Sequence, residues 1–270
     1  RTRNFEWIVG GNIAKSTAKL KALGGEKQVI LDGNYNGMQL VNRVGESPYQ
    51  FYGYQADGVF STQAEADEAA LVNRTGRSYS AGDVRFVDQN GDHRIDDKDR
   101  VLLGSASPDY FGGFYTQLKY KGLALSAEFS YSKGNMAYNA VRQQLESMST
   151  TNNQSLSVLN RWTVDGQKTD VPRARWKDPV GNSYFSSRWI EDASYLRLKN
   201  VTLSYTFSKT VWNFFRSGTL YVTGENLLTF TDYLGMDPEF SSSYSENVQG
   251  LDYGKLMQPK TVKVGVNLKF

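Results

Sequence analysis

The sequence contains no cysteine, one histidine and six prolines in 270 residues. Without cysteine, the chain has no disulfide, no thiolate nucleophile and no cysteine-bound zinc. A catalytic triad would have only His93 as its base. No run of about 18 apolar residues occurs, which excludes a membrane-spanning helix. The net charge of +3 is small and the basic residues are scattered, so we expect no nucleic-acid-binding surface and no nucleic-acid partner.

Aromatic residues and glycine, in contrast, are abundant, with 17 Tyr, 14 Phe and 25 Gly. This composition favours many strands joined by flexible turns over a helical bundle. The mean hydropathy is negative. Strands of a membrane barrel alternate apolar and polar side chains, so such an average is compatible with a transmembrane barrel.

The last ten residues carry the clearest strand pattern. Apolar side chains alternate without exception with Lys263, Gly265, Asn267 and Lys269. A tilted strand of about 10 residues crosses the hydrocarbon layer. On this segment alone, an edge strand of a soluble sandwich is the alternative. The alternating apolar residues, which end on an aromatic, are Val262, Val264, Val266, Leu268 and Phe270.

Five further segments show the same period of two, which makes six predicted strands. A tight turn at Lys121-Gly122 joins two of them into a hairpin. A one-residue phase shift near Lys199-Asn200 predicts a β-bulge. The five segments are 5–13, 112–120, 123–131, 195–207 and 219–230.

The connections between these strands alternate between long and short, as in outer-membrane barrels with long external loops and short periplasmic turns. They are 15–109 (long), 121–122 (short), 133–190 (long), 208–218 (short) and 232–259 (long). Six strands are too few to close a membrane barrel, so we expect the other strands to come from a longer parent chain. Aromatic residues near strand ends are expected to form interfacial girdles: Trp189, Tyr195, Trp212, Phe214, Phe215, Phe230 and Tyr233.

Residues 88–99 match the spacing of a twelve-residue calcium loop. His93 stands at the sixth position, where such loops carry glycine, and histidine tolerates the left-handed backbone required there. The alternative is an acidic surface turn that hydrogen-bonds to itself. Bound calcium would stiffen a long external loop. The expected ligands are Asp88, Asn90, Asp92, Arg94 through its carbonyl group, Asp96 and Asp99.

Several short blocks, taken in order, resemble the SusC/RagA class of TonB-dependent outer-membrane transporters. No single block is specific, but their order and spacing together are. The resemblance covers nearly the whole chain. The blocks are FYGY at 51–54, DGVF at 57–60, GDVRFVD at 82–88, residues 108–113, SYLRLKNV at 194–201, GENL at 224–227 and GMDPE at 235–239.

The resemblance implies an all-β fold, a 22-stranded transmembrane barrel of which residues 1–270 form the last six or so strands. Residues 82–104 would be an acidic, calcium-loop-like insert in an extracellular loop. It also implies a multi-pass protein in the outer membrane of a Gram-negative bacterium, embedded in lipid. It would import oligosaccharides or peptides, powered by the TonB complex through an upstream plug region and covered by a SusD-like lipoprotein lid. The last strand, ending at Phe270, resembles the signal read by the barrel-assembly machinery.

Two other functions are weighed against a transporter. The first is a secreted, soluble β module that binds carbohydrate or a partner through a dockerin-like calcium loop. The second is a glycosidase using Asp237 and Glu239, which is disfavoured because neighbours in sequence meet no test of carboxylate separation. We therefore expect no enzyme and no organic cofactor. The sequence does not identify the substrate-binding residues. The membrane hypothesis requires that lipid, rather than protein, covers Leu125, Phe129, Leu203, Val262 and Val264.

Overall fold

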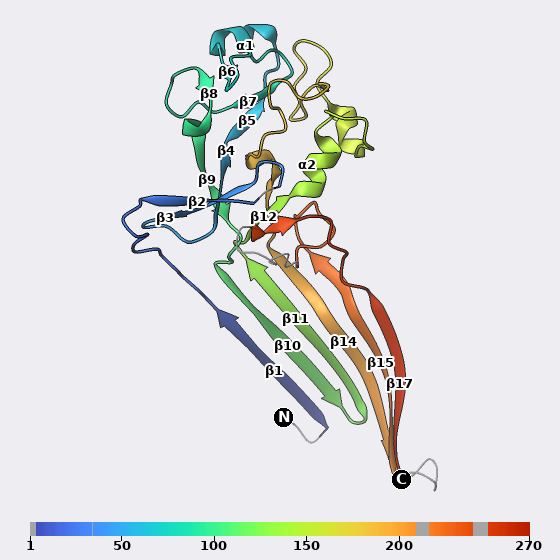
Figure 1. Ribbon diagram of the computed structural model, residues 1–270. Coiled ribbons are helices and arrows are strands. Elements are labelled where there is room, and N and C mark those ends of the chain that lie inside the picture. The colour runs from blue at the N-terminus through green and yellow to red at the C-terminus, as the bar shows by residue number, and fades with distance from the viewer. Residues whose placement is uncertain (1–3, 34, 209–215, 240–247) are drawn as a thin grey trace.

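The computed structural model describes residues 4–33, 35–208, 216–239 and 248–270. Six long strands form one antiparallel sheet, and the three long connections fold above it into a loop region (Figure 1). The strands follow the order β1-β10-β11-β14-β15-β17. The prediction of six long strands is confirmed. They are β1 (Phe5–Ala14), β10 (Tyr110–Tyr120), β11 (Leu123–Lys133), β14 (Tyr195–Ser208), β15 (Ser217–Phe230) and β17 (Thr261–Lys269).

The strand pairing places side chains in rows that cross the whole sheet. One row contains only apolar residues and runs through Trp7, Leu118, Leu125, Leu203, Val222 and Val264. The next row towards the loop region is mostly polar and runs through Ile8, Gln117, Ser126, Thr202, Thr223 and Lys263. Because successive side chains of a strand point to opposite faces, the sheet has one apolar face and one polar face.

The register of β14 shifts at Lys199. Leu198 and Asn200 pair with neighbouring positions of β11, while Lys199 is an extra residue between them. The pairing of β14 with β15 shifts at the same point. The predicted bulge is therefore confirmed. It keeps the apolar residues on either side of it, Leu198 and Val201, on one face.

The loop region comprises the described residues of segments 15–109, 134–194 and 231–260. Its largest sheet has the order β2-β3-β4-β9 and contains β2 (Gln28–Asp32), β3 (Gln39–Arg43), β4 (Gln50–Tyr54) and β9 (Arg100–Ser105). A three-stranded sheet contains β12 (Met136–Asn139), β13 (Ile190–Asp192) and β16 (Leu251–Asp252). Two pairs complete it: β5 (Ala56–Val59) with β7 (Val84–Phe86), and β6 (Val72–Asn73) with β8 (Arg94–Ile95).

The helices of the loop region are short, and side chains fix where they begin. The Thr62 hydroxyl accepts a hydrogen bond from Glu65 N at the start of α1 (Gln63–Ala69). The Asn139 amide oxygen accepts one from Arg142 N at the start of α2 (Ala140–Glu146). Both are ordinary N-cap contacts. Three short 3-10 helices are η1 (Asp97–Asp99), η2 (Leu156–Asn160) and η3 (Ser187–Trp189).

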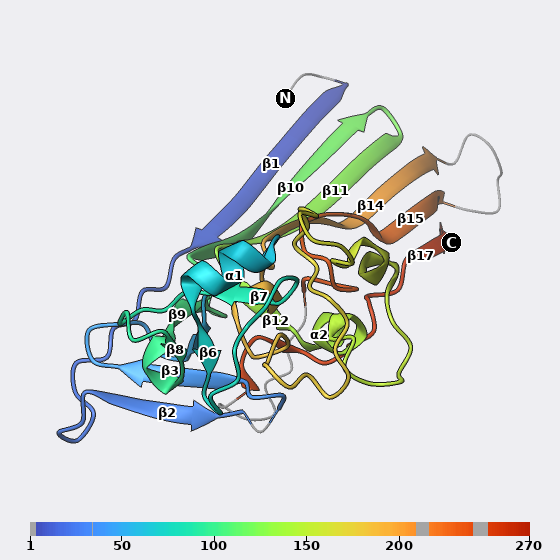
Figure 2. The ribbon, with the colours of Figure 1, turned by 90° about the horizontal axis from the view of Figure 1, so that it is seen from above.

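Buried hydrophobic side chains lie in the loop region. One cluster surrounds Phe51, Tyr138 and Trp189, and another surrounds Phe86 and Ile95. Within the described residues, no hydrophobic side chain of the six long strands is buried. Seen from above, the long strands lie side by side in a single layer, with the loop region to one side (Figure 2). The six-stranded sheet therefore has no protein core of its own.

Candidate functional site

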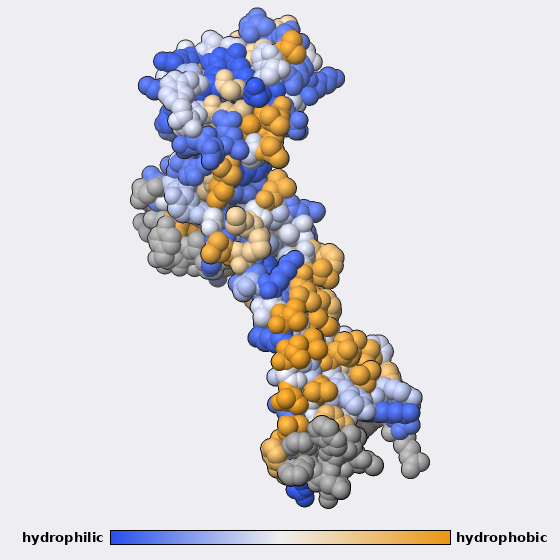
Figure 3. All heavy atoms as spheres, turned by 90° about the vertical axis from the view of Figure 1, so that its right-hand side faces the viewer, coloured by the Kyte–Doolittle hydropathy of each residue, from blue (hydrophilic) through white to orange (hydrophobic). Residues whose placement is uncertain are grey.

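The apolar face of the six-stranded sheet is uncovered. Val264 is 78% exposed, Leu203 48% and Leu125 41%. Phe129 is partly buried, and its ring stacks on Phe114 of the neighbouring strand with centroids 4.6 Å apart. Figure 3 shows hydrophobic side chains gathered along the long strands and mostly hydrophilic ones over the loop region. A soluble sandwich would bury this face under a second layer, and the described residues form none.

The terminal strand presents the same apolar face. Val262, Val264, Val266 and Leu268 are all exposed, and Phe270 is 82% exposed. Strand β17 pairs with β15 along one edge, and within the described chain no strand pairs with its other edge. An unpaired edge cannot remain in lipid, because its backbone groups would have no hydrogen-bond partners there. The geometry requires further strands. The role of this strand in barrel assembly stays a prediction.

The predicted aromatic girdle holds only in part. Phe230 is 59% exposed at the loop end of β15, and Tyr195 lies partly buried at the start of β14. Trp189 and Tyr233 were expected at the interface, and this prediction is wrong. Both are buried in the loop region, Trp189 in the large cluster and Tyr233 against Ala137 and Ala193. Trp212, Phe214 and Phe215 lie outside the described residues.

The polar face is joined to the loop after β15 by buried charges. Arg197 of β14 donates a hydrogen bond to the carboxylate of Asp237 and is 2% exposed. Its Nη1 atom lies 3.1 Å from Glu239 Oε2, outside hydrogen-bonding geometry. Lys199 Nζ lies 2.7 Å from the same Glu239 oxygen. Asp237 and Glu239, the pair considered for glycosidase chemistry, are thus bound to basic side chains.

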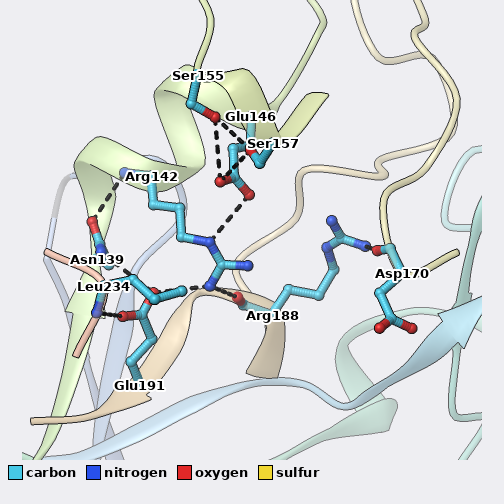
Figure 4. Close-up of polar contacts among 9 residues, drawn as sticks. All are labelled: Asn139, Arg142, Glu146, Ser155, Ser157, Asp170, Arg188, Glu191 and Leu234. Carbon is cyan, nitrogen blue, oxygen red and sulfur yellow. Dashed lines mark hydrogen bonds and ion pairs between the residues drawn. The ribbon is translucent and has the colours of Figure 1, made fainter. Parts of the chain in front are cut away.

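A second charged cluster ties the loops to one another (Figure 4). Arg142 of α2 lies 3.1 Å from Glu146 Oε2 and 2.8 Å from Glu191 Oε1. The other Glu191 oxygen accepts a hydrogen bond from Leu234 N at 3.0 Å. Burial opposes the charge of Arg142, but Glu191 and Glu146 outweigh it and raise its pKa. The segments containing α2, β13 and Leu234 are therefore held together.

Arg188 lies beside this cluster but turns away from it towards Asp170 (Figure 4). Its Nη1 donates to the Asp170 carbonyl oxygen at 2.9 Å. Burial, together with the nearby charge of Arg142, lowers the pKa of Arg188 to about 10. Its guanidinium lies 5.1 Å from the ring centroid of Trp189, where the aromatic face partly stabilises the charge.

The acidic turn at residues 88–99 folds on itself. The Asp88 carboxylate accepts hydrogen bonds from Gly91 N and His93 N, at 2.8 and 2.7 Å. The Asp99 carboxylate accepts from Gln89 N and Asp96 N. The left-handed backbone expected at the sixth position is confirmed, since His93 has φ 57°. The turn packs onto the second core cluster through the fully buried Ile95.

The side chains predicted as calcium ligands, those of residues 88, 90, 92, 96 and 99, form hydrogen bonds within the turn. The Asn90 amide donates to Asp92 Oδ2 at 2.9 Å, which is the main reason that the pKa of Asp92 is lowered. Asp96 and Asp99 form a capping box around η1. Arg94 N donates to Asp92 Oδ1. In the described part of the chain, no three acidic or histidine side chains gather around a shared point. Calcium binding stays a prediction.

The sequence did not identify a large cavity in the loop region. Its volume is about 830 Å³, and its walls come from six separate stretches of chain, two of which contribute only Arg74 and Arg100. They include the turn before β3, strand β4, the end of α2 with the residues after it, and residues 176–185. The only sequence signal for such a cavity is the presence of aromatic residues in strongly polar loops. That signal does not show which of these residues come together in the fold.

No protein-family model matches the chain. The TonB-dependent receptors P3 and P26 of Formosa agariphila are 31% and 32% identical to it, over 99% and 100% of its length. TonB-dependent receptor SusC of Bacteroides thetaiotaomicron is 25% identical over the whole chain. The chain is homologous to TonB-dependent receptors of the SusC/RagA type. It covers 27%, 28% and 25% of those three relatives, about a quarter of each.

The fold agrees with this relationship. A solved structure described as the RagAB peptide transporter superposes with a TM-score of 0.77 and 23% identity. A second, the RagAB peptide importer in the open-open state, gives 0.75 and 22%. Both matches cover 100% of this chain, and 28% and 27% of the other chains. The six-stranded sheet is therefore a segment of the barrel of a TonB-dependent receptor. None of the helices among the described residues is long and apolar enough to span a membrane.

Proposed function

We propose that the chain forms part of an outer-membrane, TonB-dependent importer of oligosaccharides or peptides in a Gram-negative bacterium. The observation that carries the proposal is the exposed apolar face of six strands in register, which contains no buried hydrophobic side chain. Lipid is the solvent that such a face requires. The names of similar proteins support transport. Three relatives are named TonB-dependent receptors, and one solved structure is described as a peptide transporter.

In this proposal the loop region is extracellular, and the two short connections face the periplasm. Lid closure by a SusD-like lipoprotein would occur at the loop region, and energy would come from the TonB complex through a plug region upstream. Exposed apolar side chains support a partner surface on the loops: Leu156 is 84% exposed, Leu159 71% and Val164 63%. Exposed apolar side chains favour contact with another protein where they form a contiguous patch.

A labelling experiment tests the topology, because this chain contributes no cysteine background. Leu159→Cys in the loop region and Lys121→Cys in the short turn are introduced separately into the full-length receptor. In intact cells, a membrane-impermeant maleimide should label Cys at 159 and leave 121 unlabelled. Permeabilising the outer membrane should expose both. Labelling of both sites in intact cells would contradict the proposal.

Uptake is tested separately. A strain that lacks the receptor gene should lose uptake of a fluorescent oligosaccharide or peptide from a panel, and a plasmid copy should restore it. A strain that carries the receptor but lacks TonB should resemble the deletion. If uptake of every compound in the panel is unchanged by both deletions, the import function is wrong.

We also propose that the acidic turn binds calcium and stiffens the loop between β1 and β10. The left-handed His93 and the buried Ile95 support a calcium-loop backbone. The carboxylates now accept hydrogen bonds from the turn, so binding would have to redirect some of their oxygens towards the ion. A hard cation needs about 6 to 8 oxygen ligands, which the turn would supply with water.

A further inference from the structure

The cavity in the loop region has an unusual lining. Among the described residues around it, there is no alanine, valine, leucine, isoleucine, methionine or proline. Its walls consist of aromatic, amide, hydroxyl, glycine and charged residues. Ligand pockets are usually lined mainly by hydrophobic side chains with a few polar groups. A peptide that anchors itself through apolar side chains would therefore find aromatic rings but no aliphatic subsite.

A sugar matches this lining better. The C–H face of a pyranose ring packs against the electron-rich face of an aromatic ring, and its hydroxyl groups bond to amides and hydroxyls. Trp176 is 61% exposed at the cavity, which leaves its indole accessible to a ligand. Tyr184 supplies a further, partly buried ring, whereas the rings of Tyr52 and Tyr54 are buried in the wall. Asn36 and Asn152 supply amides.

The charge of the lining favours an anion. Arg74 and Arg100 share one carboxylate, Asp97, at 3.7 and 2.9 Å. Lys177 has no acidic group within ion-pair distance in the described part of the chain. The Asp178 carboxylate accepts hydrogen bonds from the N–H groups of residues 181, 182 and 183, so it is already occupied. Three cations therefore face two engaged carboxylates.

Polar atoms at the cavity also lack partners. Tyr54 is 3% exposed, and its hydroxyl has no hydrogen-bond partner in the described chain. The same holds for Nε of Arg100, whose guanidinium lies 5.3 Å from the Tyr54 ring centroid. A buried polar group without a partner is costly. Both atoms are shielded from solvent, so a ligand oxygen would bond to them only after the cavity wall shifts. Both residues line the cavity.

The exposed wall of the cavity is held in place before any ligand arrives. Lys177 and Asp178 both adopt the left-handed backbone, with φ 60° and 45°. Lys177 N donates to the Ser149 carbonyl oxygen at 2.9 Å, which ties this turn to the segment after α2. Strained, over-determined backbone of this kind is concentrated at ligand-binding sites. Trp176 and Lys177 are therefore presented in a fixed position.

We propose that this cavity binds an acidic oligosaccharide, with Trp176 stacked on a sugar ring and Arg74, Arg100 and Lys177 facing its carboxylates. The inference rests on the proposed import function, because it names the substrate class that the loop region would capture. Tyr54 and Arg100 are inner contacts, and Trp176 and Lys177 are outer ones.

Titration calorimetry on the full-length receptor in detergent tests the proposal. The probes are the trimers of galacturonate, mannuronate and guluronate, the methyl ester of each, and triglutamate as an acidic peptide. At least one acidic trisaccharide should bind about tenfold more tightly than its neutral ester, since charge-assisted hydrogen bonds are the stronger ones. Failure of all three acidic sugars, equal binding of the ester, or equal binding of triglutamate would each overturn the proposal.

Variants locate the binding. Trp176→Ala and Lys177→Gln should each weaken the best acidic trisaccharide about tenfold or more. The matched controls are Leu159→Ala and Lys168→Gln, which remove an exposed apolar group and an exposed cation away from the cavity and should leave affinity unchanged. Equal losses in variants and controls would reject this site. Binding of the trisaccharide without cellular uptake would reject the import function but support the binding site. Cellular uptake together with unaltered binding in the cavity variants would reject the binding site but support import.

Discussion

Arg197 and Asp237 form a buried ion pair between the polar face of the six-stranded sheet and the loop that follows β15. Their side chains are 3% and 5% exposed. The two residues are 40 positions apart, so the pair closes a long loop onto the sheet. Asp237 also accepts hydrogen bonds from Glu239 N and Gln258 N, at 2.8 and 2.9 Å. It thereby fixes both the outgoing and the returning arm of that loop.

Removing one partner of this pair should be strongly destabilising. Asp237→Ala leaves the Arg197 charge buried, which typically costs about 3–5 kcal/mol in the free energy of unfolding. The measurement is urea unfolding of the full-length receptor in lipid vesicles. The control is Asp57→Ala, which breaks an exposed pair with Arg85 at 2.9 Å and should cost about 0–1 kcal/mol. A similar loss of unfolding free energy in both variants would contradict a stabilising role for the buried pair of Arg197 and Asp237.

The same pair predicts a loss of stability in acid. Burial raises the pKa of Asp237, but hydrogen bonds from Arg197, Gln258 and Glu239 outweigh it and hold the pKa below its usual range. A carboxyl group with a depressed folded-state pKa stabilises the protein above its unfolded pKa of about 3.9 and loses that contribution as the pH falls through the folded value. Unfolding curves from about pH 6 down to about pH 2 should be less acid-sensitive for Asp237→Asn than for the native receptor, with the difference developing below about pH 4.

Two adjacent residues of β11 test which face meets lipid. Leu125 belongs to the apolar row and Ser126 to the polar row. Leu125→Arg places a charge in hydrocarbon and should cost about 2–4 kcal/mol near the membrane midplane. Ser126→Arg adds the same side chain to the other face and should be nearly neutral. Unfolding in lipid vesicles and the yield of protein in the outer membrane measure the difference. If Ser126→Arg were the more destabilising variant, the face that contains Ser126 would be the one in contact with lipid.

Calcium binding is tested by limited proteolysis and calorimetry of the full-length receptor. Calcium should slow cleavage in the loop between β1 and β10, and Asp88→Ala or Asp92→Ala should abolish the effect. Asp67→Ala, which removes an exposed carboxylate of α1 outside the turn, should retain it. Unchanged calcium affinity in Asp88→Ala and Asp92→Ala would show that the turn is a self-bonded acidic surface feature.

The long strands could be predicted because alternation is a local property. Each of the six carries its own pattern, and Lys199 reveals its bulge through a phase shift in that pattern. The two short connections also predict which strands pair through them, β10 with β11 and β14 with β15. The faces could also be assigned, since Leu125 and Val264 lie in one row of the sheet.

The loop region could not be predicted in the same way. Trp189 looked like an interfacial residue because it stands near a strand end, yet it is buried against residues from other loops. The cavity joins Tyr54 to Trp176 across more than a hundred positions of sequence. Neither contact has a local signature, because strands of two to six residues and separate loops are brought together only by their shared cores.

The bulge in β14 has one more consequence. Lys199 is an extra residue only in the pairing with β11. In the pairing with β15, two residues, Asn226 and Leu227, stand opposite it. Deleting Lys199 would therefore make the β11 pairing regular but leave both β15 residues unmatched, and the ion pair with Glu239 would be lost. One position thus couples the strand pairing of the sheet to the attachment of the loop after β15.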